Sequence, residues 1–290
     1  MYNSGKELLT LTKERNCKIS EIVIEKECKL TGLSINDVRN KMKNNLEVMR
    51  ESAKLGLEQD IKSVGGIIGG DAKRVNDYRM SQKTLCGDTI NKAMARALSC
   101  SEVNASMGRI CAAPTAGSAG IIPATIITAS EVLNSTDEEI INALFTASGI
   151  GEIIAKNATL SGAEGGCQAE CGSASAMAAA AIVEMAGGSP EMSLHAAATA
   201  IKNVMGLICD PIAGLVEAPC TKRNASGTIN ALLSADLALA GVKSIIPFDE
   251  VIEAMYKVGK SLPHELRETA LGGVAATETG IKIKEKIFGK

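Results

Sequence analysis

Aromatic side chains are almost absent from this chain, and their scarcity limits the folds that it can adopt. The 290 residues include three Phe, three Tyr and no Trp. A core without rings must be filled by Ala, Leu, Ile, Val and Met, and small side chains let helices approach one another closely. Strands would require more Val, Thr, Tyr and Phe. The composition therefore favours a compact α-helical packing over a β-sandwich.

The spacing of apolar residues predicts the same fold class. Between residues 35 and 53 they recur every three or four positions, which predicts an amphipathic helix of about five turns. Residues 34–37 resemble a capping box at its start, and residues 135–138 form a second one. Because no convincing alternation of apolar and polar residues occurs, we predict an all-α protein. Further helices are predicted over residues 171–185, 190–200, 229–239 and 249–258.

The length of the chain is that of one large domain. We expect a single α-helical catalytic domain over residues 1–290, with an arm of amphipathic helices (residues 1–60) before a core (residues 61–290). The amphipathic helix of residues 35–53 either packs against the rest of the chain or embraces a partner. Two glycine pairs in residues 65–70 lack the Lys-Ser/Thr of a P-loop, so a tight turn between approaching backbones is the simpler interpretation.

The balance of charge argues against nucleic acid and membrane partners. Thirty-one Lys and Arg residues stand against 33 Asp and Glu, giving a formal net charge of −2 and a pI near 5.9. The longest run without charge, residues 110–130, is interrupted by prolines and glycines and is a poor membrane span. Residues 1–13 contain no apolar signal region. We therefore expect a cytoplasmic protein that binds neither nucleic acid nor membrane.

Three short segments combine glycines and prolines with polar residues between the predicted helices. They cover residues 107–120, 162–172 and 206–224. Loops held by a rigid frame are where binding and catalytic residues concentrate. We therefore expect the functional site to be built from these three segments.

The cysteines point to the same segments. Nine cysteines, an odd number, indicate ligands or buried thiols rather than a disulfide framework. Cys167, Cys209 and Cys220 lie in the loop segments, with 41 and then 10 residues between them. Loop backbone can turn such thiolates toward a shared centre, although the close pairs and histidines of a zinc knuckle are missing. Spacing alone leaves two interpretations open, a three-thiolate metal site and a set of buried thiols.

The loop segments resemble a known family. They read GRICAAPTAGSAGIIPA, GAEGGCQAECGSASAMAAAA and GLICDPIAGLVEAPCTKRN. These sequences look like the iron–sulfur-dependent L-serine dehydratases, and specifically like the α chain of the two-subunit form. The resemblance runs from about Gly65 to the C-terminus, the N-terminal helices fit as well, and the GGCQ, CDP and PC motifs at this spacing are highly specific.

The resemblance implies a cofactor and a reaction. The family carries a [4Fe–4S] cluster on three cysteines, which correspond here to Cys167, Cys209 and Cys220, whereas Cys111 and Cys171 do not correspond to ligands. The loops of the core would then bind the cluster. A cluster with one iron free of protein ligands acts as a Lewis acid rather than as an electron carrier. The implied reaction converts L-serine to pyruvate and ammonia without pyridoxal phosphate.

The resemblance also implies a protein partner. The two-subunit family places a separate domain on a β chain, and this chain ends at Lys290 without the cysteine-bearing tail of the single-chain relatives. We therefore expect the chain to be active only together with a β chain.

The general base is not identified by the sequence. His195 lies in an alanine-rich helix and His264 at a helix start, so neither is well placed for proton transfer. If a histidine is the base, the β chain supplies it. Glu164 and Glu170 flank Cys167, and for each of them a structural salt bridge and a catalytic role are both open.

Five polar residues are candidates for contact with L-serine. Lys222, Arg223 and Asn224 directly follow a cysteine of the implied cluster, so a cation there would lie near the cluster and bind the substrate carboxylate. Support of the sulfur or of the helix start is the alternative for these three. Thr115 and Ser118, between a proline and a glycine, would orient the substrate through side chain and backbone.

Other functions remain open at this stage. An L-cysteine desulfidase-like lyase would perform the same elimination with sulfide leaving, although the GLVEAPCTKRN stretch favours the serine enzyme. A non-catalytic iron–sulfur sensor or scaffold should carry a nucleic-acid reader or a second domain, and a structural helical protein would merely contain incidental thiols. Threonine as a second substrate is undecided, because one methyl group changes specificity by only about 1–3 kcal/mol.

Overall fold

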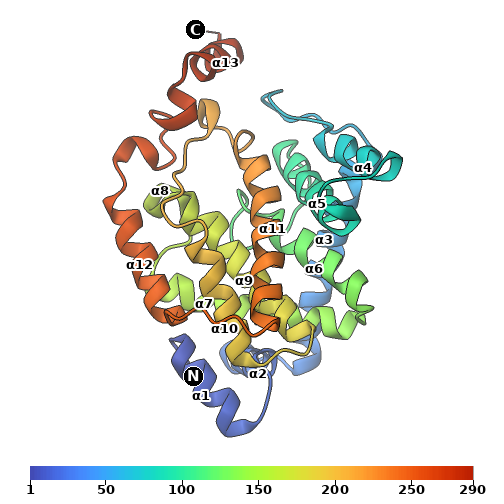
Figure 1. Cartoon of the computed structure of the whole chain (residues 1–290), viewed down its shortest axis with the longest axis vertical. Coiled ribbons are helices and arrows are strands. Elements are labelled where there is room, and N and C mark those ends of the chain that lie inside the picture. The colour runs from blue at the N-terminus through green and yellow to red at the C-terminus, as the bar shows by residue number, and fades with distance from the viewer. Residues whose placement is uncertain (290) are drawn as a thin grey trace.

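A computed structural model describes residues 1–289, which form thirteen α-helices and no strand (Figure 1). The predicted all-α class is therefore confirmed. In chain order the helices are α1 (Gly5–Arg15), α2 (Ile19–Thr31), α3 (Ile35–Glu58), α4 (Asp71–Ser81), α5 (Gly87–Ala105), α6 (Ile121–Leu133), α7 (Asp137–Asn157), α8 (Gly162–Gly165), α9 (Ser173–Met185), α10 (Pro190–Lys202), α11 (Cys220–Leu239), α12 (Phe248–Ser261) and α13 (Glu278–Phe288). A π-helix covers Gln168–Gly172, and 3₁₀-helices cover Ile212–Gly214, His264–Leu266 and Gly273–Ala276. Within the described part, no helix combines the length and the apolar character needed to cross a membrane.

Helix α9 forms the centre of the molecule. Every residue from Ser173 to Glu184 is buried, and the helix packs against α6, α7, α10 and α11 (Figure 1). Alanine and serine dominate its sequence, so its surface is narrow and the surrounding helices approach it closely. The core expected from the lack of aromatic residues is thus built around one small-residue helix.

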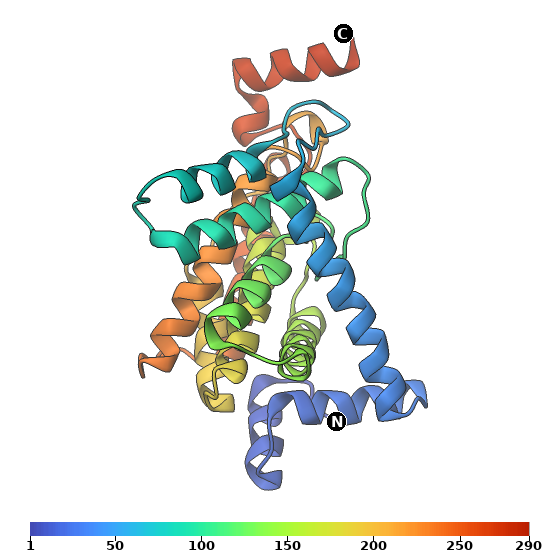
Figure 2. The same ribbon diagram turned by 90° about the vertical axis from the view of Figure 1, so that its right-hand side faces the viewer.

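The two ends of the chain lie at opposite ends of the molecule. Helices α1 and α2 lie together at the N-terminal end, whereas α13 projects from the other end (Figure 1). Helix α3 runs along one side between them (Figure 2) and packs against α5. The short helix α8 and the start of α11, which carry two of the three sequence motifs, lie toward the α13 end (Figure 1).

Polar caps set the helix boundaries largely as the sequence predicts. The Ser34 side chain accepts a hydrogen bond from the backbone N–H of Asp37, as expected for the start of α3. The second predicted capping box is displaced by one residue, because Thr136 rather than Ser135 caps α7 and pairs with Glu139. The backbone N–H of Ser135 instead donates to the carbonyl of Ser130, which closes the end of α6.

The N-terminal arm packs against the rest of the chain. The backbone N–H groups of Gly5 and Lys6 donate to the carboxylate of Asp249, at 2.6 and 2.9 Å. The N–H of Ile19 donates to Glu184 at 2.9 Å. Both carboxylates thus lie at helix N-termini, whose partial positive charge they stabilise. The helix predicted over residues 35–53, α3, packs against α5, while the division of the chain into arm and core stays a prediction.

Replacement of Gly56 by alanine tests the close packing of α3 on α5. A Cβ at this position would lie 2.9 Å from Ser99 Oγ and 3.0 Å from Ser99 Cα. Glycine to alanine inside a helix is normally stabilising, by roughly 0.5–1 kcal/mol. Because α3 must move away from α5, we expect Gly56→Ala to lower the free energy of unfolding by about 1–3 kcal/mol.

Denaturant unfolding measures this loss, and Asn44→Ala on the exposed face of the same helix is the matched control. The control should unfold at or above the wild-type midpoint. A Gly56→Ala variant as stable as the control would contradict the tight crossing of the two helices.

Candidate functional site

Three cysteines from three separate segments are buried in one region of the molecule. Cys167 lies between α8 and the π-helix, Cys209 lies in the loop after α10, and Cys220 is the first residue of α11. Their exposed fractions are 2%, 3% and 9%. A charge on Cys167 raises the pKa of both Cys209 and Cys220, and a charge on Cys220 raises the pKa of Cys209, so the three thiols lie close enough to interact electrostatically. These are the cysteines for which the sequence left a metal site and buried thiols as alternatives.

The backbone around Cys167 is fixed by its two neighbours in the GGCQ motif. Gly166 has φ = +77°, a left-handed conformation that disfavours any residue with a side chain. The fully buried side chain of Gln168 donates hydrogen bonds to the carbonyls of Gly165 and Met255, and accepts one from the N–H of Gly206. Gln168 thus joins this loop to α12 and to the loop that leads to Cys209.

The backbone around Cys209 is paired with a distant part of the chain. The N–H of Cys209 donates to Leu266 at 2.9 Å, and its carbonyl accepts from the N–H of Glu268 at 2.7 Å. The next residue, Asp210, forms a 2.7 Å ion pair with Arg223 and accepts a hydrogen bond from the N–H of Val274. The CDP motif is therefore anchored both to α11 and to the segment before α13.

The third segment connects α11 to the loop that contains Thr115 and Ser118. Buried Asn224 donates to the carbonyls of Gly117 and Cys220, at 2.7 and 3.0 Å, and accepts from the N–H of Gly120. All three of these hydrogen bonds join the Asn224 side chain to backbone groups. The structure thus places the predicted residue Asn224 as a support of two loops.

The pKa values of the three thiols are shifted in different directions. Hydrogen-bonding contact with Cys171, whose Sγ is 3.3 Å away, and the nearby Arg223 guanidinium lower the pKa of Cys167. Burial, together with the charge of Cys167, raises the pKa of Cys209. The same two effects raise the pKa of Cys220 to about 12. Cys167 is therefore the most readily ionised of the three thiols, and a bound cation would favour the thiolate form of the other two.

The set of donors fits an iron–sulfur cluster better than a single metal ion. Among residues 1–289, no group of three or more His, Cys, Asp or Glu side chains is arranged around one ion position. Ligands of a single ion such as zinc must all lie about 2.3 Å from it. In a cubane cluster each thiolate binds a different iron, so the sulfurs lie farther apart. Three buried thiols on three separate loops are donors of the type that such a cluster takes.

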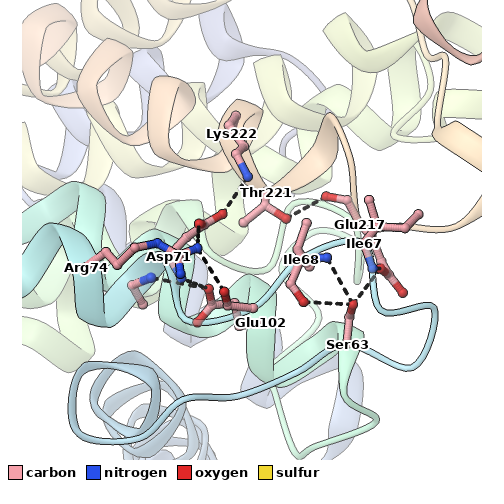
Figure 3. A network of polar contacts seen from close by, with 11 residues as sticks. Ser63, Ile67, Ile68, Asp71, Arg74, Glu102, Glu217, Thr221 and Lys222 are labelled. Carbon is pink, nitrogen blue, oxygen red and sulfur yellow. Dashed lines mark hydrogen bonds and ion pairs between the residues drawn. The ribbon is translucent and has the colours of Figure 1, made fainter. Parts of the chain in front are cut away.

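Arg223 and Lys222, which are adjacent in the sequence, point to different neighbours. Arg223 is partly buried between Asp210 and the thiol of Cys167, and also donates to the carbonyl of Ile208 at 3.0 Å. The Lys222 side chain is 61% exposed and pairs with Asp71 at 2.5 Å, as Figure 3 shows. Of the two predicted cations, the structure brings only Arg223 to the thiols.

An open cleft of about 540 Å³ lies beside Cys209 and is lined by three carboxylates, of which Glu164 is exposed. Glu170 and Glu268 line this cleft together with Thr115, whose hydroxyl donates to Glu170 Oε1. Glu170 forms no ion pair with the described residues, so the salt bridge considered for it is not observed. Burial raises its pKa, and the charge of Glu268 adds to this effect. A carboxyl with a raised pKa in a cleft is a candidate for proton transfer.

Of the two predicted substrate residues, Thr115 faces the cleft and Ser118 lies behind Thr115 in the interior. Their hydroxyl oxygens are 2.9 Å apart, and only Thr115 lines the cleft, because Ser118 is fully buried. The two histidines lie elsewhere: His195 accepts a hydrogen bond from the N–H of Ser244, and the His264 side chain is exposed.

The glycine pairs of residues 65–70 form the tight turn expected from the sequence. Buried Glu217, three residues before Cys220, accepts hydrogen bonds from the N–H groups of Gly65 and Ile67 and from the Ser63 hydroxyl, at 2.7, 3.1 and 2.6 Å (Figure 3). A side chain on Gly65 would collide with Glu217. This turn therefore holds the segment that leads into Cys220.

Four residues of the site were not singled out in the sequence: Gln168, Asp210, Glu217 and Glu268. The first three lie inside the quoted segments, so the motifs contained a signal for them. Glu268 belongs to no motif and reaches the site only through the backbone pairing with Cys209.

Replacement of Glu217 by glutamine tests the link between the glycine turn and Cys220. The amide NH₂ would face N–H donors and leave buried hydrogen bonds unmade, so we expect the free energy of unfolding to fall by roughly 2–4 kcal/mol. Glu51→Gln, on the exposed face of α3, is the control and should unfold like wild type. Equal denaturation midpoints for the two variants would show that the turn is held by other contacts.

Comparison with known proteins agrees with this arrangement. The family described as "Serine dehydratase alpha chain" matches residues 14–275. The probable L-serine dehydratase α chain of Bacillus subtilis is 53% identical over 289 residues, covering 100% of this chain and 96% of that protein. The L-serine dehydratase α chain of Peptoniphilus asaccharolyticus is 54% identical over 284 residues, covering 98% and 97%. The L-serine dehydratase of Streptomyces coelicolor is 34% identical over 282 residues, covering 94% of this chain but 60% of the longer relative. The chain belongs to the serine dehydratase α-chain family.

Proposed function

We propose that this chain is the α subunit of an L-serine dehydratase, which converts L-serine to pyruvate and ammonia. The observation that carries the proposal is the meeting of Cys167, Cys209 and Cys220, buried and held by three independent sets of hydrogen bonds. The names of the relatives support the same substrate and reaction.

In this proposal the three thiols hold a [4Fe–4S] cluster. When bound, the cluster would supply an iron without a protein ligand, a Lewis acid for an elimination that leaves hydroxide. Arg223, beside Cys167, would balance the negative charge that the thiolates bring to a buried site. Its ion pair with Asp210 keeps the guanidinium in place.

We propose Glu170 as the group that receives the α-proton of the substrate. The Oε1 atom of Glu170 accepts a hydrogen bond from the Thr115 hydroxyl. Its Oε2 atom faces Gly162, and Cys209 Sγ approaches the same glycine. The carboxylate is therefore oriented, adjacent to a thiol of the site and open to the cleft. Its raised pKa makes it a stronger base than an exposed glutamate. Proton transfer to Oε2 would need no histidine from this chain.

The remaining predicted residues take positioning roles in this proposal. Thr115 orients Glu170 and contacts the substrate, and Ser118 holds Thr115 from behind. Asn224 supports the loop that carries them. Lys222 is assigned no contact with the substrate, because its ammonium group is paired with Asp71 on α4.

A β chain is the proposed partner. The two relatives of similar length are called α chains, and the chain aligns with only 60% of the longer L-serine dehydratase of Streptomyces coelicolor. A second subunit would supply what corresponds to the rest of that longer protein and would cover the open side of the Glu170 cleft. Serine turnover is therefore expected from the two chains together and not from this chain alone.

Replacement of one thiol tests the cluster. Purified without oxygen together with its β chain, the wild type should contain about four iron atoms and four acid-labile sulfides per α chain. Cys209→Ser should lose most of this iron and its brown colour, because the site would keep only two thiolates. Cys111→Ser removes a thiol outside the set of three and should keep the iron. Full iron content in Cys209→Ser would contradict the assignment of the ligands.

Replacement of Glu170 by glutamine tests the proton transfer. The amide keeps the shape of the side chain but cannot accept a proton, so we expect kcat for pyruvate formation to fall by about 100-fold or more with little change in KM. The control, Glu164→Gln, changes an exposed glutamate of the same cleft and should keep wild-type kcat. An increase in KM alone would assign Glu170 to substrate binding instead. The same assay with L-cysteine distinguishes serine dehydratase from desulfidase activity.

A further inference from the structure

A fourth thiol touches the proposed ligand Cys167. Cys171 Sγ lies 3.3 Å from Cys167 Sγ, and both side chains are buried, with exposed fractions of 3% and 2%. Cys171 corresponds to no ligand of the cluster and takes no part in the mechanism above. The contact between Cys167 and Cys171 therefore has no role in the cluster or in the proton transfer, and we consider what two adjacent thiols can do.

The backbone allows these two sulfurs to approach further. The residues are four apart at the start of a helix, where Cα atoms are about 6 Å apart, within the range that a disulfide bridges. Cβ atoms at this spacing are about 5–6 Å apart, whereas a disulfide needs about 3.5–4.5 Å. Cys167 is preceded by Gly165 and Gly166 and followed by a π-helix, so it lies at a place where the helix is already irregular. A disulfide there would be strained and easily reduced.

A small oxidant has a route to the pair. Cys171 lines an open cleft of about 420 Å³, together with Gly206, Leu207 and Arg223. This cleft is distinct from the one that contains Glu170, because the two share no lining residue. Peroxide could therefore reach the Cys171 sulfur, and the Cys167 sulfur in contact with it, without passing through the proposed substrate cleft.

We propose that Cys167 and Cys171 form a reversible disulfide when the chain lacks its cluster. Cys167 sulfur attacks one oxygen of hydrogen peroxide, the O–O bond breaks, and a sulfenic acid and one water result. Cys171 sulfur then attacks the Cys167 sulfur, the S–O bond breaks, and a second water leaves. The two thiols together lose two protons and two electrons, and one peroxide is reduced to two waters.

The disulfide would both block and protect the site. This consequence rests on the proposed function: with Cys167 in a disulfide, only two thiols remain for iron. The bond also keeps Cys167 from irreversible oxidation to sulfinic acid, because Cys171 consumes the sulfenic acid first. Reduction by a dithiol returns the ligand, so the chain could be reloaded with iron after oxidative damage.

Peptide mass spectrometry tests the proposal directly. The full-length chain is stripped of iron with a chelator, treated with hydrogen peroxide, blocked with iodoacetamide and digested. We expect one peptide in which Cys167 and Cys171 are both unalkylated and which lacks two hydrogen masses. After dithiothreitol both residues should be alkylated again. Cys167 as sulfinic acid beside a free Cys171, or Cys167 linked to Cys209 or Cys220, would overturn the proposal.

Two variants separate the resolving thiol from general damage. In Cys171→Ser, peroxide should drive Cys167 to sulfinic acid that dithiothreitol does not reverse, and iron should not rebind. Cys111→Ser, the control, should behave like wild type in both respects. If circular dichroism shows that Cys171→Ser is unfolded, Cys171→Ala takes its place, and the wild-type digest remains decisive by itself.

The same experiment separates this proposal from the proposed cluster. Reduced wild-type chain is incubated with ferrous iron and sulfide, and its iron content is compared with that of the peroxide-treated chain. A disulfide in a chain that never binds iron would refute the cluster and leave the thiol pair standing. Full iron uptake by the oxidised chain, with the disulfide still present in its digest, would show that Cys167 is not a ligand.

Discussion

Buried loops must satisfy their own backbone polar groups, and the site depends on how this chain meets that requirement. Each of the three segments that carry the site cysteines is held by a buried side chain that makes hydrogen bonds to backbone atoms. Gln168 does this beside Cys167, Asp210 beside Cys209, and Asn224 at the start of α11. Removal of any of these contacts would leave donors or acceptors without partners in an apolar interior, where they cost about 1–3 kcal/mol each. The precise placement of the sulfurs follows from this bonding.

The scarcity of aromatic residues and the geometry of the site are connected. Because α9 is built mostly of alanine and serine, α6, α7, α10 and α11 pack closely around it. The π-helix that precedes α9 continues directly from Cys167, so the central helix and the first thiol are one continuous element. A core with large rings would separate the surrounding helices and with them the loops that they carry.

The sequence predicted the helical class and the segments of the site, because composition, spacing and motifs are local properties. It did not distinguish Lys222 from Arg223, since successive residues of a helix point in directions about 100° apart and the sequence does not show which direction faces the thiols. Glu268 was invisible for a different reason: it reaches the site through pairing of its backbone with Cys209, a contact between distant segments. The cap of α7 shifted from Ser135 to Thr136 because Ser135 is needed to close α6.

The docking of the N-terminal helix on Asp249 has a consequence for synthesis of the chain. Gly5 emerges from the ribosome well before Asp249, because the carboxylate that accepts its N–H lies 244 residues later in the sequence. Helix α1 is therefore synthesised long before the α12 residue on which it docks. In the same way, α2 is synthesised long before Glu184, which accepts a hydrogen bond from its first residue. The docking of α1 therefore comes late in folding, because it requires a contact between two segments that lie 244 residues apart.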